Sequence, residues 1–238
     1  EAKLGQTSDT YDRDGNLSEP ETVDHLTCEM IENTLSEFSG EIKQRPPLYS
    51  ALKHEGRRLY KYARAGEQVE IPERQITVHS LELLEYKTPL LWFAVRCSKG
   101  TYVRSLVHDL GEKLGCGAHV TELRRTAIGG IKVETALPLE QLEKRVAAGD
   151  TDSFVIGIAE MLELPELVID PAKAARVPQG IEIRARDIVA AATTLNADQL
   201  VALRNGHGNL LAVGRTLLAS ADFAQSADTK AIEYVRVM

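Results

Sequence analysis

Apolar residues recur at intervals of three and four in several stretches of the chain, which is the pattern of amphipathic helices. The pattern is clearest in residues 101–114, where the buried stripe would consist of Val103, Leu106, Val107, Leu110 and Leu114. Gly115 follows at a position where helices commonly end. Shorter patterns of the same kind predict further helices over residues 28–38, 59–65, 139–147 and 154–162.

Two strands are predicted before the clearest helix, over residues 76–86 and 90–97. The second run is nearly all apolar, so we expect it in the centre of a sheet. From about Leu164 the pattern changes to short apolar segments separated by Pro, Gly and Asn. The chain is therefore expected to divide into a larger domain, residues 1–163, and a small β-rich domain, residues 164–238.

The composition is that of a globular protein, with 43% hydrophobic and 26% charged residues among 238. Its apolar runs fall short of the roughly 20 residues that a membrane helix needs. The cysteines at positions 28, 97 and 116 are too few and too scattered for a disulfide framework. Cys116 and His119 lack a second pair of matching spacing, so we expect no metal site. These features favour the cytoplasm.

The formal net charge of −7 is unevenly distributed. Residues 1–41 carry 2 basic and 11 acidic side chains, whereas residues 42–66 carry 7 basic and 1 acidic, and residues 96–132 carry 7 basic and 3 acidic. Two basic segments in an acidic chain can form a local phosphate-binding surface. Charge alone also allows the alternative, two solvated charged faces.

The first informative stretch, residues 44–60, reads Gln-Arg-Pro-Pro-Leu-Tyr-Ser-Ala-Leu-Lys-His-Glu-Gly-Arg-Arg-Leu-Tyr. Its two prolines impose an extended chain, which would present Tyr49, Lys53, Arg57 and Arg58. Basic side chains at such positions can follow a phosphate backbone while an aromatic ring stacks on a base. The alternative is a structural crossover with solvated basic residues, in which Tyr49 packs.

The second stretch, residues 97–106, reads Cys-Ser-Lys-Gly-Thr-Tyr-Val-Arg-Ser-Leu. Its glycine lets the chain turn from the apolar strand into the helix, which places Tyr102 and Arg104 in the first helical turn. Arg104 lies beside the apolar stripe, where a guanidinium needs a carboxylate partner. An ordinary surface arginine is the alternative.

Two more stretches complete the pattern: residues 4–10 read Leu-Gly-Gln-Thr-Ser-Asp-Thr, and Gly-Cys-Gly-Ala-His at 115–119 precedes Leu-Arg-Arg-Thr at 123–126. In this order the four stretches resemble the bacterial tRNA pseudouridine synthase B family, strongly over residues 1–145 and weakly in the tail. The resemblance implies an α+β fold, in which a mixed, largely antiparallel pseudouridine-synthase sheet carries helices. A small PUA-like, RNA-binding β domain would follow it.

The activity that the resemblance implies is isomerisation of uridine to pseudouridine in the T-loop of tRNA (position 55 in tRNA numbering). The family flips the base and uses an aspartate as covalent catalyst. The resemblance implies no metal or organic cofactor. It implies the T-arm stem-loop of tRNA as the partner of a monomeric protein.

The resemblance also assigns roles to single residues. Arg104 matches the arginine that pairs with the catalytic aspartate. Tyr102 and Leu123 match the pocket that holds the flipped uridine, for which an aromatic or apolar wall is needed. Lys99, Arg124 and Arg125 are expected to contact phosphates. Read alone, Leu123 would pack in the core and Tyr102 would be a boundary residue satisfied through its hydroxyl.

In this family the catalytic aspartate lies in a Gly-Thr-Leu-Asp-Pro-like segment, which we expect upstream of Glu1. Asp9, Asp12, Asp14 and Asp109 stand in other contexts, so the 238 residues alone are expected to be inactive. Arg104 should then be solvated or take another acceptor. A non-catalytic tRNA-binding or tRNA-folding protein is the main alternative. A subunit of a guide-RNA particle is a weaker one, which the bacterial form of the motifs disfavours.

Overall fold

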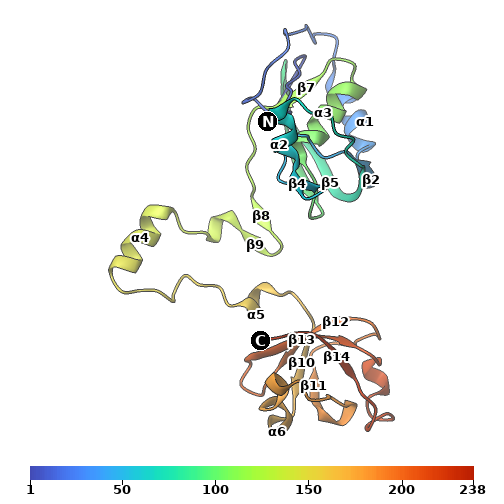
Figure 1. Ribbon diagram of the computed structural model, residues 1–238, viewed down its shortest axis with the longest axis vertical. Coiled ribbons are helices and arrows are strands. Elements are labelled where there is room, and N and C mark those ends of the chain that lie inside the picture. The colour runs from blue at the N-terminus through green and yellow to red at the C-terminus, as the bar shows by residue number, and fades with distance from the viewer. The chain divides into compact units, whose positions relative to one another are not determined.

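The computed structural model describes residues 1–158 and 160–238, and the chain forms two compact units (Figure 1). The first unit is Glu1–Arg124 and the second is Arg125–Met238. The second unit begins earlier than the domain predicted from residue 164, because it includes the segment between Arg125 and the second large sheet. The predicted boundary at residues 163 and 164 stays a prediction.

The first unit is built on a five-stranded sheet in the order β2-β5-β6-β1-β7, and every neighbouring pair of strands is antiparallel. Its strands are β1 (Ala2–Leu4), β2 (Gly40–Gln44), β5 (Arg74–Lys87), β6 (Leu90–Cys97) and β7 (Ala118–Val120). The strands predicted over residues 76–86 and 90–97 are therefore confirmed. The apolar run of β6 does occupy the middle of the sheet.

Helices α1 (Cys28–Ser36) and α3 (Val103–Lys113) pack with this sheet around one hydrophobic core. The predicted stripe of α3 is buried at Leu106, Val107 and Leu110, since these face the strands. Helix α3 approaches β7 so closely that a Cβ on Gly111 would lie 2.2 Å from the backbone nitrogen of Ala118. This approach fixes the helix on the sheet and with it the residues at its N-terminus.

A small hairpin and helix follow the two prolines. Strands β3 (Lys53–His54) and β4 (Arg57–Arg58) are joined by Glu55 and Gly56, both with positive φ, as in the hairpin turns that favour glycine. Helix α2 (Leu59–Ala65) comes directly after β4 and ends at Gly66, which has a φ of 67°. The predicted helix over residues 59–65 is confirmed.

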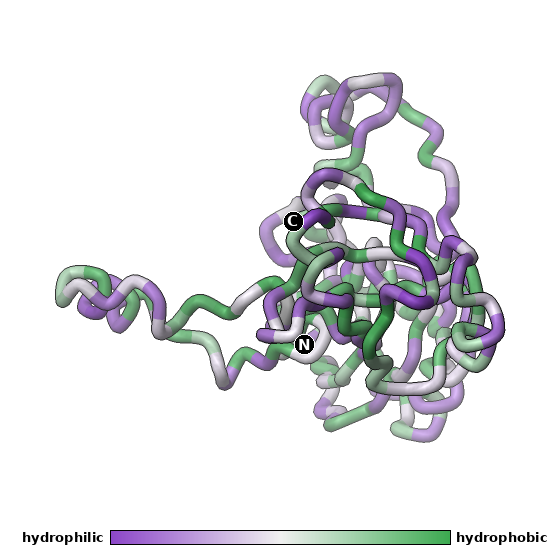
Figure 2. Tube along the Cα trace, turned by 90° about the horizontal axis from the view of Figure 1, so that it is seen from below, coloured by the Kyte–Doolittle hydropathy of each residue, from purple (hydrophilic) through white to green (hydrophobic). Residues whose placement is uncertain are grey.

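The second unit begins with short elements and continues into a second five-stranded sheet. The short elements are β8 (Ala127–Ile128), β9 (Ile131–Lys132), η1 (Val133–Thr135), α4 (Leu139–Ala147) and α5 (Ile158–Met161). Only part of the helix predicted over residues 154–162 forms, because Gly157 is extended and begins α5 as its N-cap. In Figure 2, hydrophobic and hydrophilic stretches alternate along the trace, as one-sided burial requires.

The second sheet has the order β11-β10-β12-β13-β14, with β10 and β12 parallel and the other pairs antiparallel. Its strands are β10 (Glu166–Ile169), β11 (Ile188–Ala191), β12 (Leu200–Arg204), β13 (Leu210–Thr216) and β14 (Ile232–Val237). Short helical turns connect them: α6 (Pro171–Ala174), η2 (Val177–Gln179), η3 (Ala185–Asp187) and η4 (Ser220–Asp222). The predicted α+β class is confirmed, and the chain from residue 166 is rich in strands as expected.

Residues 181–183, one of the short apolar segments of the β-rich part of the chain, form no strand. Ile183 is nevertheless fully buried in the second core, and its carbonyl accepts a hydrogen bond from the backbone N–H of Ala231. Burial thus explains the apolar pattern there. Within the described residues, no helix has both the length and the apolar character that crossing a membrane requires.

Candidate functional site

The site is built at the N-terminus of α3, where the chain leaves β6. Gly100 has a φ of 85° and allows the sharp turn that the sequence indicated. Helix α3 begins at Val103, two residues later than predicted, because Tyr102 is still extended at the N-cap. Arg104 therefore lies in the first turn of α3 as predicted, whereas Tyr102 precedes the helix as its N-cap residue.

The extended backbone of Tyr102 is held by Gln44, the last residue of β2. The Gln44 side-chain oxygen accepts from the Tyr102 N–H at 2.8 Å, and its amide nitrogen donates to the Tyr102 carbonyl at 3.0 Å. Only 3% of Gln44 is exposed. A buried glutamine bonded in this way fixes the start of the helix. Sequence reasoning missed this residue, although it opens the proline-rich stretch.

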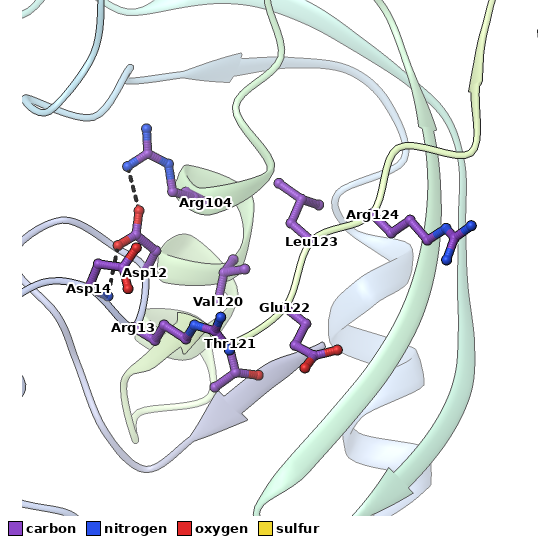
Figure 3. A pocket seen from close by; sticks show the side chains of 9 residues that line it. All are labelled: Asp12, Arg13, Asp14, Arg104, Val120, Thr121, Glu122, Leu123 and Arg124. Carbon is purple, nitrogen blue, oxygen red and sulfur yellow. Dashed lines mark hydrogen bonds and ion pairs between the residues drawn. The ribbon is translucent and has the colours of Figure 1, made fainter. Parts of the chain in front are cut away.

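The guanidinium of Arg104 is held by three oxygens. It donates to Oδ2 of Asp12 at 2.8 Å (Figure 3). It also donates to the carbonyl of Thr10 at 3.1 Å and to the carbonyl of Tyr49 at 3.0 Å. The side chains of Arg104 and Asp12 are 24% and 26% exposed, so the ion pair is largely withdrawn from water. The expectation that Arg104 needs a carboxylate is confirmed, and the carboxylate in this structure is that of Asp12.

Asp12 is fixed in turn by its own loop. Its Oδ1 accepts from the Thr10 hydroxyl at 2.8 Å and from the Asp14 N–H at 3.1 Å, which leaves Oδ2 for Arg104. Sequence reasoning gave Asp12 no role, because it lies 92 positions from Arg104 and outside the expected aspartate segment. The only signal was its place two residues after the end of the Leu-Gly-Gln-Thr-Ser-Asp-Thr stretch.

A hollow of about 470 Å³ opens beside this ion pair (Figure 3). Leu123 lines it and is 60% exposed, so the alternative prediction that this leucine packs in the core is wrong. The hollow is lined by Asp12, Arg13, Asp14, Arg104, Val120, Thr121, Glu122, Leu123 and Arg124. It thus combines an apolar wall with charged groups of both signs.

The residues expected to contact RNA lie on several elements. Lys53 and Arg58 face each other across the β3–β4 hairpin, and Lys99 is exposed in the turn before α3. The backbone of Tyr49 touches the site through its bond to Arg104. Arg124 lines the hollow, whereas Arg125 is the first residue of the second unit.

Arg57 is already engaged within the hairpin region. Its guanidinium donates to both carboxylate oxygens of Glu67 at 2.8 Å and lies 4.4 Å from the centre of the Tyr62 ring. These contacts keep the planar guanidinium extended beside α2. A phosphate approaching Arg57 would compete with Glu67.

Metal-binding groups do not gather anywhere in the described residues. His119 is buried, and its Nδ1 lies 2.8 Å from the carbonyl of Gln6, so its side chain is held within the scaffold. Burial raises the pKa of the Cys116 thiol, so this side chain behaves as a small apolar group.

The chain belongs to the TruB family of pseudouridylate synthases. Residues 1–103 match the N-terminal domain of TruB family pseudouridylate synthase, and residues 104–169 match the C-terminal domain of tRNA pseudouridylate synthase B. The family expected from the four stretches is therefore confirmed.

Relatives named tRNA pseudouridine synthase B align over most of the chain. The protein from Azoarcus sp. (strain BH72) is 46% identical over 182 residues, which are 76% of this chain and 60% of the relative. The protein from Cupriavidus metallidurans (strain ATCC 43123 / DSM 2839 / NBRC 102507 / CH34) is 39% identical over 218 residues, which are 90% of this chain and 68% of the relative. The chain thus corresponds to about two thirds of the length of these relatives.

The fold is also similar to a chain in the crystal structure of a Cbf5-Nop10-Gar1 complex. The TM-score is 0.70 with 26% sequence identity, covering 99% of this chain and 65% of that one. A structure of an H/ACA RNP bound to a substrate RNA containing 2'-deoxyuridine gives a TM-score of 0.71 at 23% identity, covering 99% of this chain and 64% of that one, which supports the fold alone.

Proposed function

We propose that the protein isomerises uridine to pseudouridine in the T-loop of tRNA, with the flipped base held in the hollow beside Arg104. The observation that carries the proposal is the ion-paired guanidinium of Arg104 at the edge of a hollow walled by Leu123. Membership of the TruB family and the names of the relatives support it.

The residues of this chain would bind the base and orient the reacting carboxylate. Extrusion of a base from its stack requires a pocket with an apolar or aromatic wall. Leu123 would supply this wall from the lining of the hollow, and Tyr102 would add to it from the N-cap of α3, two residues before Arg104. Arg104 would hold the covalent aspartate by a charge-assisted hydrogen bond and keep it aimed at the base. We assign that aspartate to the Gly-Thr-Leu-Asp-Pro-like segment of the family, not to Asp12. Both oxygens of Asp12 already accept hydrogen bonds.

Phosphate contacts would come from the basic residues around this site. Lys53, Arg57 and Arg58 on the hairpin, with Lys99 and Arg124 nearer the hollow, can neutralise the backbone of a stem-loop. We further propose that residues 164–238, as a PUA-like domain, add RNA affinity. No metal or organic cofactor enters the proposed reaction.

The test is tritium release from a T-arm stem-loop that carries 5-tritiated uridine, using the full-length protein. The T-loop uridine should release tritium, and a stem-loop with cytidine at that position and tritiated uridine elsewhere should not. Release from any uridine regardless of position would reject T-loop specificity. Tight tRNA binding without release would favour the tRNA-binding or tRNA-folding alternative.

A further inference from the structure

A stacked pair of rings joins α3 to the loop that brings Asp12 to Arg104. The rings of Tyr11 and His108 have centroids 4.0 Å apart and planes inclined by only 9°. His108 lies on α3 four residues after Arg104, so the two side chains share one face of the helix. Tyr11 stands between Thr10 and Asp12, which supply two of the three oxygens that bind the guanidinium.

The backbone at Tyr11 is in an unfavourable conformation. Its φ is 64°, which a bulky L-residue rarely adopts and which must be stabilised by surrounding contacts. The Tyr11 N–H donates to the carbonyl of Ser8 at 3.1 Å, and its carbonyl accepts from the N–H of Val120 at 3.0 Å. A glycine would make this turn without strain. A tyrosine here therefore indicates a use for its ring.

General core packing does not account for the pair. Both residues are half-buried, and neither belongs to the hydrophobic core of the first unit. Nδ1 of His108 is buried without a hydrogen-bond partner in the described part of the chain, so the flat face of the ring makes the specific contact. Burial raises the pKa of the Tyr11 hydroxyl above its ordinary value, which reflects the partial withdrawal of this side chain from water.

We propose that Tyr11 and His108 are positioning residues for Arg104. Their stack holds Thr10 and Asp12 against the guanidinium and thereby fixes its orientation. This inference rests on the proposed function, because the orientation of Arg104 affects a rate only if the arginine acts in that reaction. An aromatic pair shifts an equilibrium roughly two- to tenfold. Loss of the stack should therefore lower kcat by roughly two- to tenfold and leave KM for the stem-loop nearly unchanged.

Substitutions at Tyr11 separate the ring from the backbone turn. Tyr11→Phe keeps the ring and should keep kcat. Tyr11→Gly removes the ring but relieves the strain, and should lower kcat by roughly two- to tenfold. Tyr11→Ala removes the ring and keeps the strain, so its kcat should be lower still. A Tyr11→Gly protein with the kcat of the parent would overturn the proposal, since only the turn would then matter.

Further variants test whether the two rings act together and through Arg104. His108→Ala should lower kcat as Tyr11→Gly does, and the double variant should be no slower than either single one. In an Arg104→Lys background, Tyr11→Gly should have no further effect on kcat. If the reductions in kcat caused by the single substitutions simply multiply in either combined variant, the proposal is contradicted.

A matched control and an assay without turnover complete the design. Asp198 in the second unit also has a φ of 64°, so Asp198→Gly relieves the same strain elsewhere and should leave kcat unchanged. Hydrogen exchange of the Arg104 guanidinium, followed by NMR, should become roughly two- to tenfold faster in Tyr11→Gly and not in Tyr11→Phe. If the parent releases no tritium, the proposed function fails, and the exchange rates still decide whether the stack orders Arg104. If guanidinium exchange is unchanged in Tyr11→Gly, the positioning role of the stack is rejected, and the proposed function is unaffected.

Discussion

Replacing Arg104 by lysine keeps the positive charge and removes the planar group that three oxygens bind. The guanidinium donates to Asp12, Thr10 and Tyr49 at 2.8–3.1 Å. The lysine ammonium, on a flexible side chain, can face the carboxylate but cannot reproduce all three hydrogen bonds of the planar guanidinium. All three hydrogen bonds have the charged guanidinium as donor, and each such bond contributes about 1.5–3 kcal/mol. A lysine that keeps only the carboxylate contact gives up the two bonds to carbonyls. A loss of about 3 kcal/mol of orienting energy follows.

This loss corresponds to a fall in kcat of at least roughly a hundredfold. KM for the T-arm stem-loop should change little, because Arg104 orients a carboxylate and is not an expected phosphate contact. The measurement is tritium release by the full-length protein under single-turnover conditions, with RNA binding measured separately. Arg74→Lys, at an exposed position on β5, is the matched control and should retain full kcat.

Normal turnover by Arg104→Lys would refute this reasoning. The charge alone would then suffice, and the three bonds would only hold the loops together. A large rise in KM with unchanged kcat would instead make Arg104 a phosphate contact.

Three other predictions follow from single features of the structure. Gln44→Ala leaves the Tyr102 N–H without its acceptor. The free energy of unfolding measured in urea titrations should fall by about 1–3 kcal/mol, and kcat should fall as well. Unchanged values of both would contradict the positioning role of Gln44. Replacing Arg57 and Arg58 together by alanine should reduce the salt dependence of stem-loop binding by about 1 per lost contact, and superimposable salt titrations would indicate solvated faces. Burial raises the pKa of the Asp109 carboxyl, and His108 partly opposes this effect. The folded state therefore binds the carboxyl proton more tightly than the unfolded state does. The free energy of unfolding should fall as the pH rises from 3.8 through the folded-state pKa. Asp109→Asn should therefore unfold at higher urea concentration than the parent at pH 7 but not near pH 3, and a variant that is less stable at pH 7 would show that the carboxylate is favourable there.

The local pattern of the sequence determined the main secondary structure and the nature of the site. The apolar spacing of residues 101–114 located α3, the apolar run of residues 90–97 located the central strand, and Gly100 indicated the turn between them. These features follow from helix and strand periods and from the backbone freedom of glycine, all of which act between close neighbours in the chain. The need of Arg104 for a carboxylate followed from the cost of desolvating a charge.

Which groups meet at the site was decided only by tertiary structure. Asp12 lies 92 positions from Arg104, and Gln44 lies 58 positions from Tyr102. Tyr11 stacks on His108 because one loop and one helix happen to converge, and no periodicity in either segment encodes that contact. Such pairs depend on how the antiparallel sheet orders β2, β1 and β7 around α3. Sequence patterns identify a residue that requires a partner, whereas only packing of distant segments selects which residue fills that role.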